Sequence, residues 1–197
     1  SIYQIAYPDA PLSKAAENIC NAIACYERTL IKLNSRFDKH MNGKPVLTKN
    51  EINGFNLFMG KAKCGTCHFM PLFSGAKPPR YYFMESEVIG VPSNRDKKNT
   101  KLDPDSGRYL ATGYPIHLFS FKTSSLRNIA LTAPYMHNGV FNTLEEVIDF
   151  YDKGGGKGLQ IAPPNQSLPF DQLRLTATEK KDIISFMKTL TDTSGRY

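Results

Sequence analysis

The sequence lacks the long apolar runs, repeats and basic stripes that mark several large classes of protein. No apolar run approaches the roughly 18–20 residues that cross a bilayer, which excludes a transmembrane helix. The first residues, Ser1-Ile2-Tyr3-Gln4, have neither the basic start nor the apolar stretch of a signal peptide, so we expect a mature chain or an excised fragment. No internal repeat is visible, and the scattered lysines form no stripe with aromatic residues, which argues against nucleic acid as a partner.

The totals fit one ordinary domain with an additional helix. The chain has 197 residues, and 41% of them are hydrophobic, which is enough for a core and argues against disorder. Its net charge of +7 favours docking of an acidic partner, although a solvated surface accounts for most of that charge. Function must therefore be sought in local motifs.

Cysteine is scarce, and two of the four cysteines belong to the most informative motif. The run Cys64-Gly65-Thr66-Cys67-His68 is the arrangement that attaches a c-type haem. Each thiol can form a thioether to a haem vinyl group, and the histidine is placed to bind the iron from one face. A structural zinc site would need a second Cys or His pair, and a thioredoxin-like redox pair would need a βαβ setting that the flanking sequence does not supply. We therefore predict one covalently bound haem c.

The other two cysteines lie in residues 13–33, which are predicted to be a helix. Ser13 is the expected N-cap, and apolar residues recur along the segment at helical spacing. Cys20 and Cys25 would lie about 140° apart around this helix, so they cannot bridge each other. We interpret them as small buried thiols, with an intermolecular disulfide as the alternative. Residues 34–45 contain glycine and proline breakers and are read as a connector.

Three later segments carry the signal for the start of an amphipathic helix. Thr48, Thr143 and Thr176 are each followed three residues later by a glutamate, the pattern of a capping box, and then by an apolar face. The first helix delivers the chain into the haem motif, and we expect it to cross the last so that both apolar faces are buried. Residues 71–115 are rich in proline, glycine and tyrosine, and we read them as ordered irregular chain with a short hairpin over one haem edge.

A six-coordinate haem needs a second axial ligand, and the residues themselves leave that choice open. The candidates are Met136, Tyr151, His137, His117 and His40. Methionine is the common choice in electron-carrying cytochromes because its soft sulfur stabilises ferrous iron and raises the potential. Met136 lies in a turn-rich segment that suits such a ligand, and composition alone favours it; a place in the core is the alternative.

Several runs of the sequence resemble the bacterial dihaem cytochrome c peroxidases, in that family's order and over nearly the whole chain from about residue 15. They are AIACYERTL (22–30), NSRFD (34–38), LFMGKA (57–62) with the haem motif, FKTSSLRN (121–128) and LTAPYMHNG (131–139). The resemblance is to the C-terminal half of such enzymes. It implies a mainly α-helical, cytochrome c-like haem-binding domain with long irregular loops at residues 45–197. Residues 1–44 would be a helix and linker shared with a missing upstream haem domain.

The resemblance also bears on the second axial ligand. In the peroxidases the distal methionine lies seventeen residues after the proline of the Thr-Ala-Pro-Tyr segment, and here that position is Tyr151. This departure resembles the MauG branch, in which a tyrosine binds the second face of this haem; it implies Tyr151 as ligand, with Met136 as the alternative. The spacing of Tyr151 also fits an aromatic residue on the buried face of its helix. A phenolate is a hard anionic donor, so it favours ferric and higher-valent iron and lowers the potential. The iron would also hold the phenol deprotonated, far below its usual pKa of ~10.

Further site residues are implied by the same alignment. Lys122 and Arg127 match basic residues near the haem, where they could pair with its propionates. Calcium at the interface with the missing domain is implied through the backbone oxygens of Thr132 and Pro134, although its side-chain ligand would come from that domain. The segment at residues 85–90 stands where the family often has a His-Asn pair, and no role is carried over to it.

The resemblance implies the electron-transfer domain of a dihaem peroxidase or MauG-like oxidoreductase. In the intact periplasmic enzyme, often a homodimer, this haem would relay electrons from a small redox protein to the upstream haem, which would reduce hydrogen peroxide. We expect this chain to lack that peroxidatic haem and to carry no catalytic residue of its own. Two alternatives remain: a free-standing monohaem cytochrome c that only carries electrons, and a chain made in the cytoplasm whose motif stays unloaded. A second Cys-x-x-Cys-His motif upstream of Ser1 would favour the peroxidase.

Overall fold

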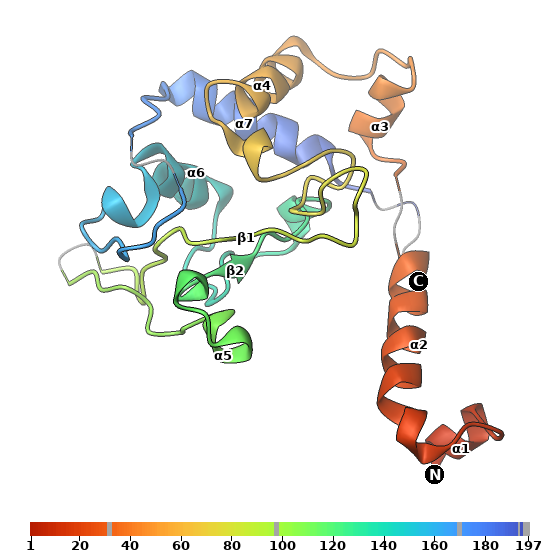
Figure 1. Ribbon diagram of the computed structural model, residues 1–197. Helices are drawn as coiled ribbons and strands as arrows, with labels where there is room; N and C mark the ends of the chain where they lie inside the picture. The colour runs from red at the N-terminus through yellow and green to blue at the C-terminus, as the bar shows by residue number, and fades with distance from the viewer. Residues whose placement is uncertain (31–32, 97–98, 169–170, 193, 195–197) are drawn as a thin grey trace.

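The computed structural model describes residues 1–30, 33–96, 99–168, 171–192 and 194, and this part of the chain is mainly helical (Figure 1). The α-helices are α1 (Ile2–Ala6), α2 (Ala15–Thr29), α3 (Arg36–Met41), α4 (Lys49–Met59), α5 (Tyr109–Thr112), α6 (Leu144–Asp152) and α7 (Ala177–Thr189). Short 3₁₀ turns lie at Leu12–Lys14, Cys64–Thr66, Pro115–His117, Ile129–Leu131 and Gly155–Lys157. Strands β1 (Ser86–Glu87) and β2 (Phe121–Lys122) form a two-stranded sheet. The predicted fold class is confirmed. None of the described helices has the length and the apolar character that crossing a bilayer requires.

Helices α4 and α7 lie side by side and pack on each other at a glycine (Figure 1). Each begins with the predicted capping box: the hydroxyls of Thr48 and Thr176 accept from the backbone N–H three residues on, and the glutamate there bonds back. At Gly54, α4 comes so close to α7 that a Cβ would collide with the backbone of Asp182. The expected crossing of these two helices is therefore confirmed.

An aromatic cluster fills the core between α3, α4, α7 and the loop after the haem motif. Its members are Phe37, Phe55, Phe58, Phe73 and Phe186, whose contacting rings have centroids 5.2 to 5.9 Å apart. Tilted and edge-on pairs of this kind add about 0.5–1.5 kcal/mol each to simple burial. Phe37 comes from the segment expected to be a connector, and that segment instead contains α3. The interpretation as a plain connector is therefore wrong, because a capping box at Ser35 starts a short helix there.

Helix α6 packs beside α7 on the other side of the core (Figure 1). It begins with the predicted capping box, in which Thr143 Oγ1 accepts from the backbone N–H of Glu146. Lys180 of α7 forms ion pairs with Asp149 (2.8 Å) and Asp152 (2.7 Å), which lie on α6. These ion pairs join α6 to α7.

Residues 71–96 and 99–115 are mostly irregular, as predicted. Its strand β1 pairs antiparallel with β2, with Ser86 opposite Lys122 and Glu87 opposite Phe121. The pairing expected as a short hairpin is therefore made between two segments that are far apart in the sequence. It places Glu87 and Lys122 next to the haem motif, because both line the cavity described below.

Helix α2 projects away from the rest of the chain, and none of its residues is buried (Figure 1). It begins at Ala15 after a 3₁₀ turn, so a helix within residues 13–33 is confirmed, while its predicted N-cap Ser13 is wrong. Residues 31–32, the end of that prediction, lie outside the described residues. Cys20 and Cys25 are exposed free thiols, so the interpretation as buried thiols is also wrong. Apolar residues at helical spacing predict an amphipathic helix, but they do not show whether another part of the protein packs on its apolar face.

Candidate functional site

The Cys-x-x-Cys-His run forms a tight turn shortly after α4. Lys63 takes a left-handed conformation (φ 57°), and Cys64–Thr66 follow as a 3₁₀ turn. The backbone N–H of His68 donates to the carbonyl of Cys64 (3.0 Å). As a result, Cys64, Cys67 and His68 all line the same cavity.

That cavity has a volume of about 450 Å³ and lies between the motif, α6, α7 and β2. Such a volume is in the range of small-molecule and cofactor sites. Apolar side chains make up much of the wall, among them Val147, Ile148, Leu173 and Met187. Within the described residues, no group of three or more His, Cys, Asp or Glu could hold a bare metal ion. The donor set therefore fits an apolar cofactor anchored by two thiols and an imidazole, which describes haem c.

A hydrogen bond from Nδ1 fixes the orientation of the His68 ring. Its Nδ1–H donates to the carbonyl of Phe73 (2.9 Å), since a carbonyl oxygen can only accept. This leaves Nε2 with the free lone pair, the arrangement found in metal-ligating histidines. Burial lowers the pKa of His68 below its ordinary value, so the ring is neutral at pH 7 and able to bind iron.

The two motif thiols are protonated in the polypeptide itself. Burial raises the pKa of Cys64 to about 12. Burial, together with the nearby carboxylate of Glu87, also raises the pKa of Cys67. Redox-active pairs instead have at least one cysteine with a lowered pKa. The environment of these thiols therefore argues against the thioredoxin-like alternative.

Three of the five candidates for the second axial ligand line the cavity: Tyr151, Met136 and His137. His117 and His40 are not among the described residues that line it. His117 Nδ1 is instead hydrogen-bonded to Thr112 Oγ1 (2.9 Å). The structure thus leaves Tyr151 and Met136, the two leading candidates, both in position to be the second axial ligand.

The three remaining candidates differ in their surroundings. His137 stacks on Phe121, with ring centroids 3.6 Å apart, and its Nε2 is 3.3 Å from Asp103 Oδ1, so its ring is engaged on two sides. Met136 has a left-handed backbone (φ 72°) in the turn after Tyr135. Tyr151 lies in α6, and burial raises the pKa of its phenol above the ordinary value. The phenol is therefore neutral in the polypeptide, and only a nearby cation such as ferric iron would stabilise the phenolate.

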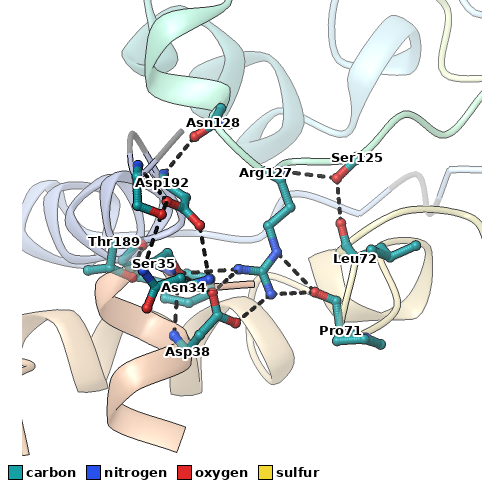
Figure 2. Close-up of polar contacts among 12 residues, drawn as sticks. Asn34, Ser35, Asp38, Pro71, Leu72, Ser125, Arg127, Asn128, Thr189 and Asp192 are labelled. Atoms are coloured by element: carbon teal, nitrogen blue, oxygen red, sulfur yellow. Dashed lines mark hydrogen bonds and ion pairs between the residues drawn. The ribbon is translucent and has the colours of Figure 1, made fainter. Parts of the chain in front are cut away.

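The residues that the resemblance implies do not all reach the cavity. Lys122, Thr132 and Pro134 line it, whereas Arg127 is absent from its described lining. Arg127 forms a two-pronged ion pair with Asp38, with Nη1–Oδ2 at 2.7 Å and Nη2–Oδ1 at 2.8 Å (Figure 2). The structure thus gives Arg127 a partner within the chain, and its pairing with a haem propionate stays untested.

Sequence reasoning missed two acidic residues of this region. Asp38 holds Arg127, and the pattern Ser35-x-x-Asp38, a capping box with Asp in place of Glu, is the signal that could have drawn attention to it. Glu87 lines the cavity and accepts a hydrogen bond from Ser167 Oγ (2.5 Å). Nothing in the local sequence marked Glu87, because its partner lies far along the chain.

Fold and cavity together define a c-type haem-binding domain. No protein-family model matches the sequence. The cytochrome-c peroxidase IdrP1 of Pseudomonas sp. strain SCT is 38% identical over 86% of this chain, and the methylamine utilization protein MauG of Methylorubrum extorquens is 31% identical over 89% of it. A MauG-like protein associated with microbial copper homeostasis has a crystal structure that matches with a TM-score of 0.72 and 33% identity, over 98% of this chain and 58% of that one.

The chain belongs to the dihaem cytochrome c peroxidase and MauG family, and it corresponds to the C-terminal haem domain of that family. The resemblance found in the residue runs is thereby confirmed. The matches cover 48% of IdrP1 and 44% of MauG, so the chain spans about half the length of these curated relatives.

Proposed function

We propose that this chain binds one haem c in the cavity and transfers electrons through it. The observation that carries the proposal is that Cys64, Cys67 and His68 line one cavity, with His68 Nε2 left free by the Nδ1 bond to Phe73. The two thiols would hold the macrocycle by thioethers, and His68 would bind the iron. Bound haem supplies reversible one-electron transfer. The residues of the chain anchor it, orient its ligands and exclude water with an apolar wall.

We further propose Tyr151 as the second axial ligand. Its place in α6, in the wall of the cavity, and its position seventeen residues after Pro134 support this role. A phenolate would stabilise ferric iron and lower the reduction potential, whereas the thioether of Met136 would raise it. Met136 is the alternative ligand, because it also lines the cavity.

Two further site proposals concern other residues that line the cavity. Lys122 lines the cavity from β2 and is proposed to pair with a propionate. The backbone oxygens of Thr132 and Pro134 are proposed as part of a calcium site, and the remaining oxygen ligands would have to come from another domain. Arg127 is left out of the propionate proposal because Asp38 already pairs with its guanidinium.

In the whole enzyme, we propose that this domain relays electrons from a small redox protein to a second haem, which reduces hydrogen peroxide in the periplasm. The support is that the relatives are named cytochrome-c peroxidase and MauG and are about twice as long as this chain. A free-standing monohaem electron carrier is the alternative. A second Cys-x-x-Cys-His motif in the same polypeptide would favour the peroxidase.

Two measurements test the haem and ligand proposals. A pyridine haemochrome spectrum of the exported chain should show one haem c per chain, and a colourless folded chain would contradict the proposal. In the loaded chain, Tyr151→Phe should change the ferric low-spin spectrum and raise the reduction potential, while Met136→Ala should leave both unchanged. The reverse pattern would assign the ligand to Met136.

A further inference from the structure

We propose that Arg127 is a positioning residue for the axial ligand His68, and that it acts through the backbone of residues 71–73. In this arrangement, Asp38 of α3 holds Arg127 in place. The proposal rests on the proposed haem function of His68, and it concerns what keeps that imidazole in its orientation.

The first observation is that the carbonyls of Pro71 and Leu72 accept hydrogen bonds from side chains of the segment that contains Arg127 (Figure 2). Arg127 donates to the carbonyl of Pro71 from both Nε (3.1 Å) and Nη2 (2.6 Å). Ser125 Oγ donates to the carbonyl of Leu72 (2.6 Å). Two successive peptide groups of the loop are therefore fixed from the same side.

The third carbonyl of the loop makes the connection to the haem site. The carbonyl of Phe73 accepts from the backbone N–H of Leu126 (3.0 Å) and from His68 Nδ1 (2.9 Å). Any movement of the loop changes the bond that sets the tautomer and the ring orientation of His68. Arg127 thus acts on His68 through two peptide groups, without touching the cavity.

The backbone of Phe73 shows that this loop needs to be held. Phe73 has a left-handed conformation (φ 49°), which is strained for a bulky residue. Its ring is completely buried, and the guanidinium carbon of Arg127 lies 5.5 Å from the ring centroid. A strained conformation persists only where its surroundings over-determine it. Here Arg127 contacts both the Pro71 carbonyl and the ring of Phe73.

Arginine is the residue that this position requires. Its five N–H donors are all used: Nη1 bonds to Asp38 and Ser35, Nη2 to Asp38 and Pro71, and Nε to Pro71. The side chains of Arg127 and Asp38 are each only 11% exposed, so the pair is largely removed from water. Lysine would keep the charge but lose the planar fork that serves three partners at once.

Asn34, which precedes α3, and Asp192, which follows α7, both lie close to the segment that contains Arg127 (Figure 2). Asn128, next to Arg127, donates from its N–H to the carbonyl of Leu190 (3.2 Å) and accepts from the N–H of Asp192 at Oδ1 (2.7 Å). Asp192 in turn accepts from the N–H of Asn34 (2.9 Å). The orientation of His68 is therefore tied to residues 34–38 and to the end of α7, as well as to its own loop.

The test compares reduction potentials and ferric electron paramagnetic resonance spectra of haem-loaded variants. A hydrogen bond from Nδ1 makes the imidazole a stronger donor and favours ferric iron. Arg127→Lys and Asp38→Asn should therefore each raise the reduction potential and shift the low-spin g-values. Ser125→Ala, which removes one bond to the loop, should raise the potential by a smaller amount.

Glu51→Gln is the matched control. Arg36 of α3 also makes a two-pronged ion pair, with Glu51 at 2.7 and 2.9 Å, but it has no bond to residues 71–73. This variant should keep the potential and the spectrum of the unaltered chain. If Arg127→Lys and Asp38→Asn behave like Glu51→Gln, the positioning role is refuted. If they do not fold, Ser125→Ala decides, and an unchanged potential refutes the role.

The haem content of the unaltered chain separates this proposal from the proposed function. An unaltered chain without haem c refutes the proposed function, and the positioning role with it. A loaded chain whose potential does not respond to these substitutions refutes only the positioning role.

Discussion

Helices α2 and α7 were both recognised by the spacing of their apolar residues, yet their apolar faces have different surroundings. In α7, Ile183 and Phe186 are completely buried. In α2, Ile19 and Ile23 are about half exposed, at 48% and 53%. The difference shows that apolar periodicity predicts a helix and its apolar face, while the cover of that face depends on residues elsewhere in the chain.

Ion pairs in the two regions differ in burial in the same way. The pair formed by Arg127 and Asp38 joins two distant segments in the core region. On the N-terminal side, Lys14 and Glu17 form an ion pair at 2.8 Å with side chains about 60% exposed, three residues apart. An exposed ion pair contributes little to stability, whereas removal of one partner of a buried pair leaves an uncompensated charge and is costly.

Breaking the two ion pairs should give the largest contrast in stability. Asp38→Asn leaves a buried guanidinium without its charge partner and should lower the free energy of unfolding by about 3–5 kcal/mol at pH 7. Glu17→Gln should change it by less than about 0.5 kcal/mol. Urea denaturation of both variants measures the two losses, and similar losses would contradict the contrast between the regions.

The stability difference between the unaltered chain and Asp38→Asn should depend on pH. Burial opposes ionisation of Asp38, but hydrogen bonds from Arg127 and Ser35 outweigh it and lower the pKa of the carboxyl. The stability from this carboxylate is therefore fully present above the unfolded-state pKa of ~3.9 and is lost as the pH falls through the lower folded-state pKa. The difference between the unaltered chain and Asp38→Asn should shrink below about pH 4. A difference that is constant from pH 7 to pH 3 would show that the charge is not involved.

Truncating isoleucine in the two helices gives the next largest contrast. Ile183→Ala removes a completely buried side chain from α7 and should cost about 2–5 kcal/mol of unfolding free energy. Ile23→Ala makes the same chemical change on α2, where we expect a loss of less than about 0.5 kcal/mol. Chemical denaturation checks both values, and an equal loss would mean that α2 is covered in solution.

Gly54→Ala tests the close approach of α4 to α7 by the sign of its effect. Helix propensity alone predicts that replacing a helical glycine with alanine stabilises by about 1 kcal/mol. The added Cβ would instead meet the backbone of Asp182, so we expect destabilisation of about 1–3 kcal/mol. A rise in the thermal midpoint would show that the two helices are farther apart than in this structure.

Thiol alkylation gives the smallest perturbation and compares the two regions directly. Cys20 and Cys25 are exposed, so iodoacetamide should label both in the folded, haem-loaded chain. Cys64 and Cys67 should stay unlabelled because thioether bonds block them. Mass spectrometry counts the adducts, and protection of Cys20 or Cys25 would reveal a cover on α2.

The features that could be predicted from the sequence are those set by residues close together in the chain. The capping boxes at Thr48, Thr143 and Thr176 involve residues three apart, and the haem motif spans five positions, so each is readable without the fold. All three capping boxes are present in the structure, and haem binding by the motif stays a prediction. The same local physics also accounts for the end of α4 and the turn that brings His68 to the cavity.

Interactions between distant residues could not be predicted in the same way. Arg127 and Asp38 are 89 residues apart, and neither has a local pattern that identifies the other. The Phe73 carbonyl that orients His68 is a backbone group, so residue type does not reveal it. The interpretation of Cys20 and Cys25 as buried thiols is wrong because their exposure depends on what α2 packs against, and the sequence of the helix does not reveal this.

The most direct test of the central claim is the mass of the peptide that contains Cys64 and Cys67, taken from a chain exported together with a c-type haem attachment system. We predict that this peptide carries one haem bound through both thiols, while the peptide with Cys20 and Cys25 carries none. An unmodified motif peptide, from cells that load a control cytochrome c in the same export, would contradict the claim.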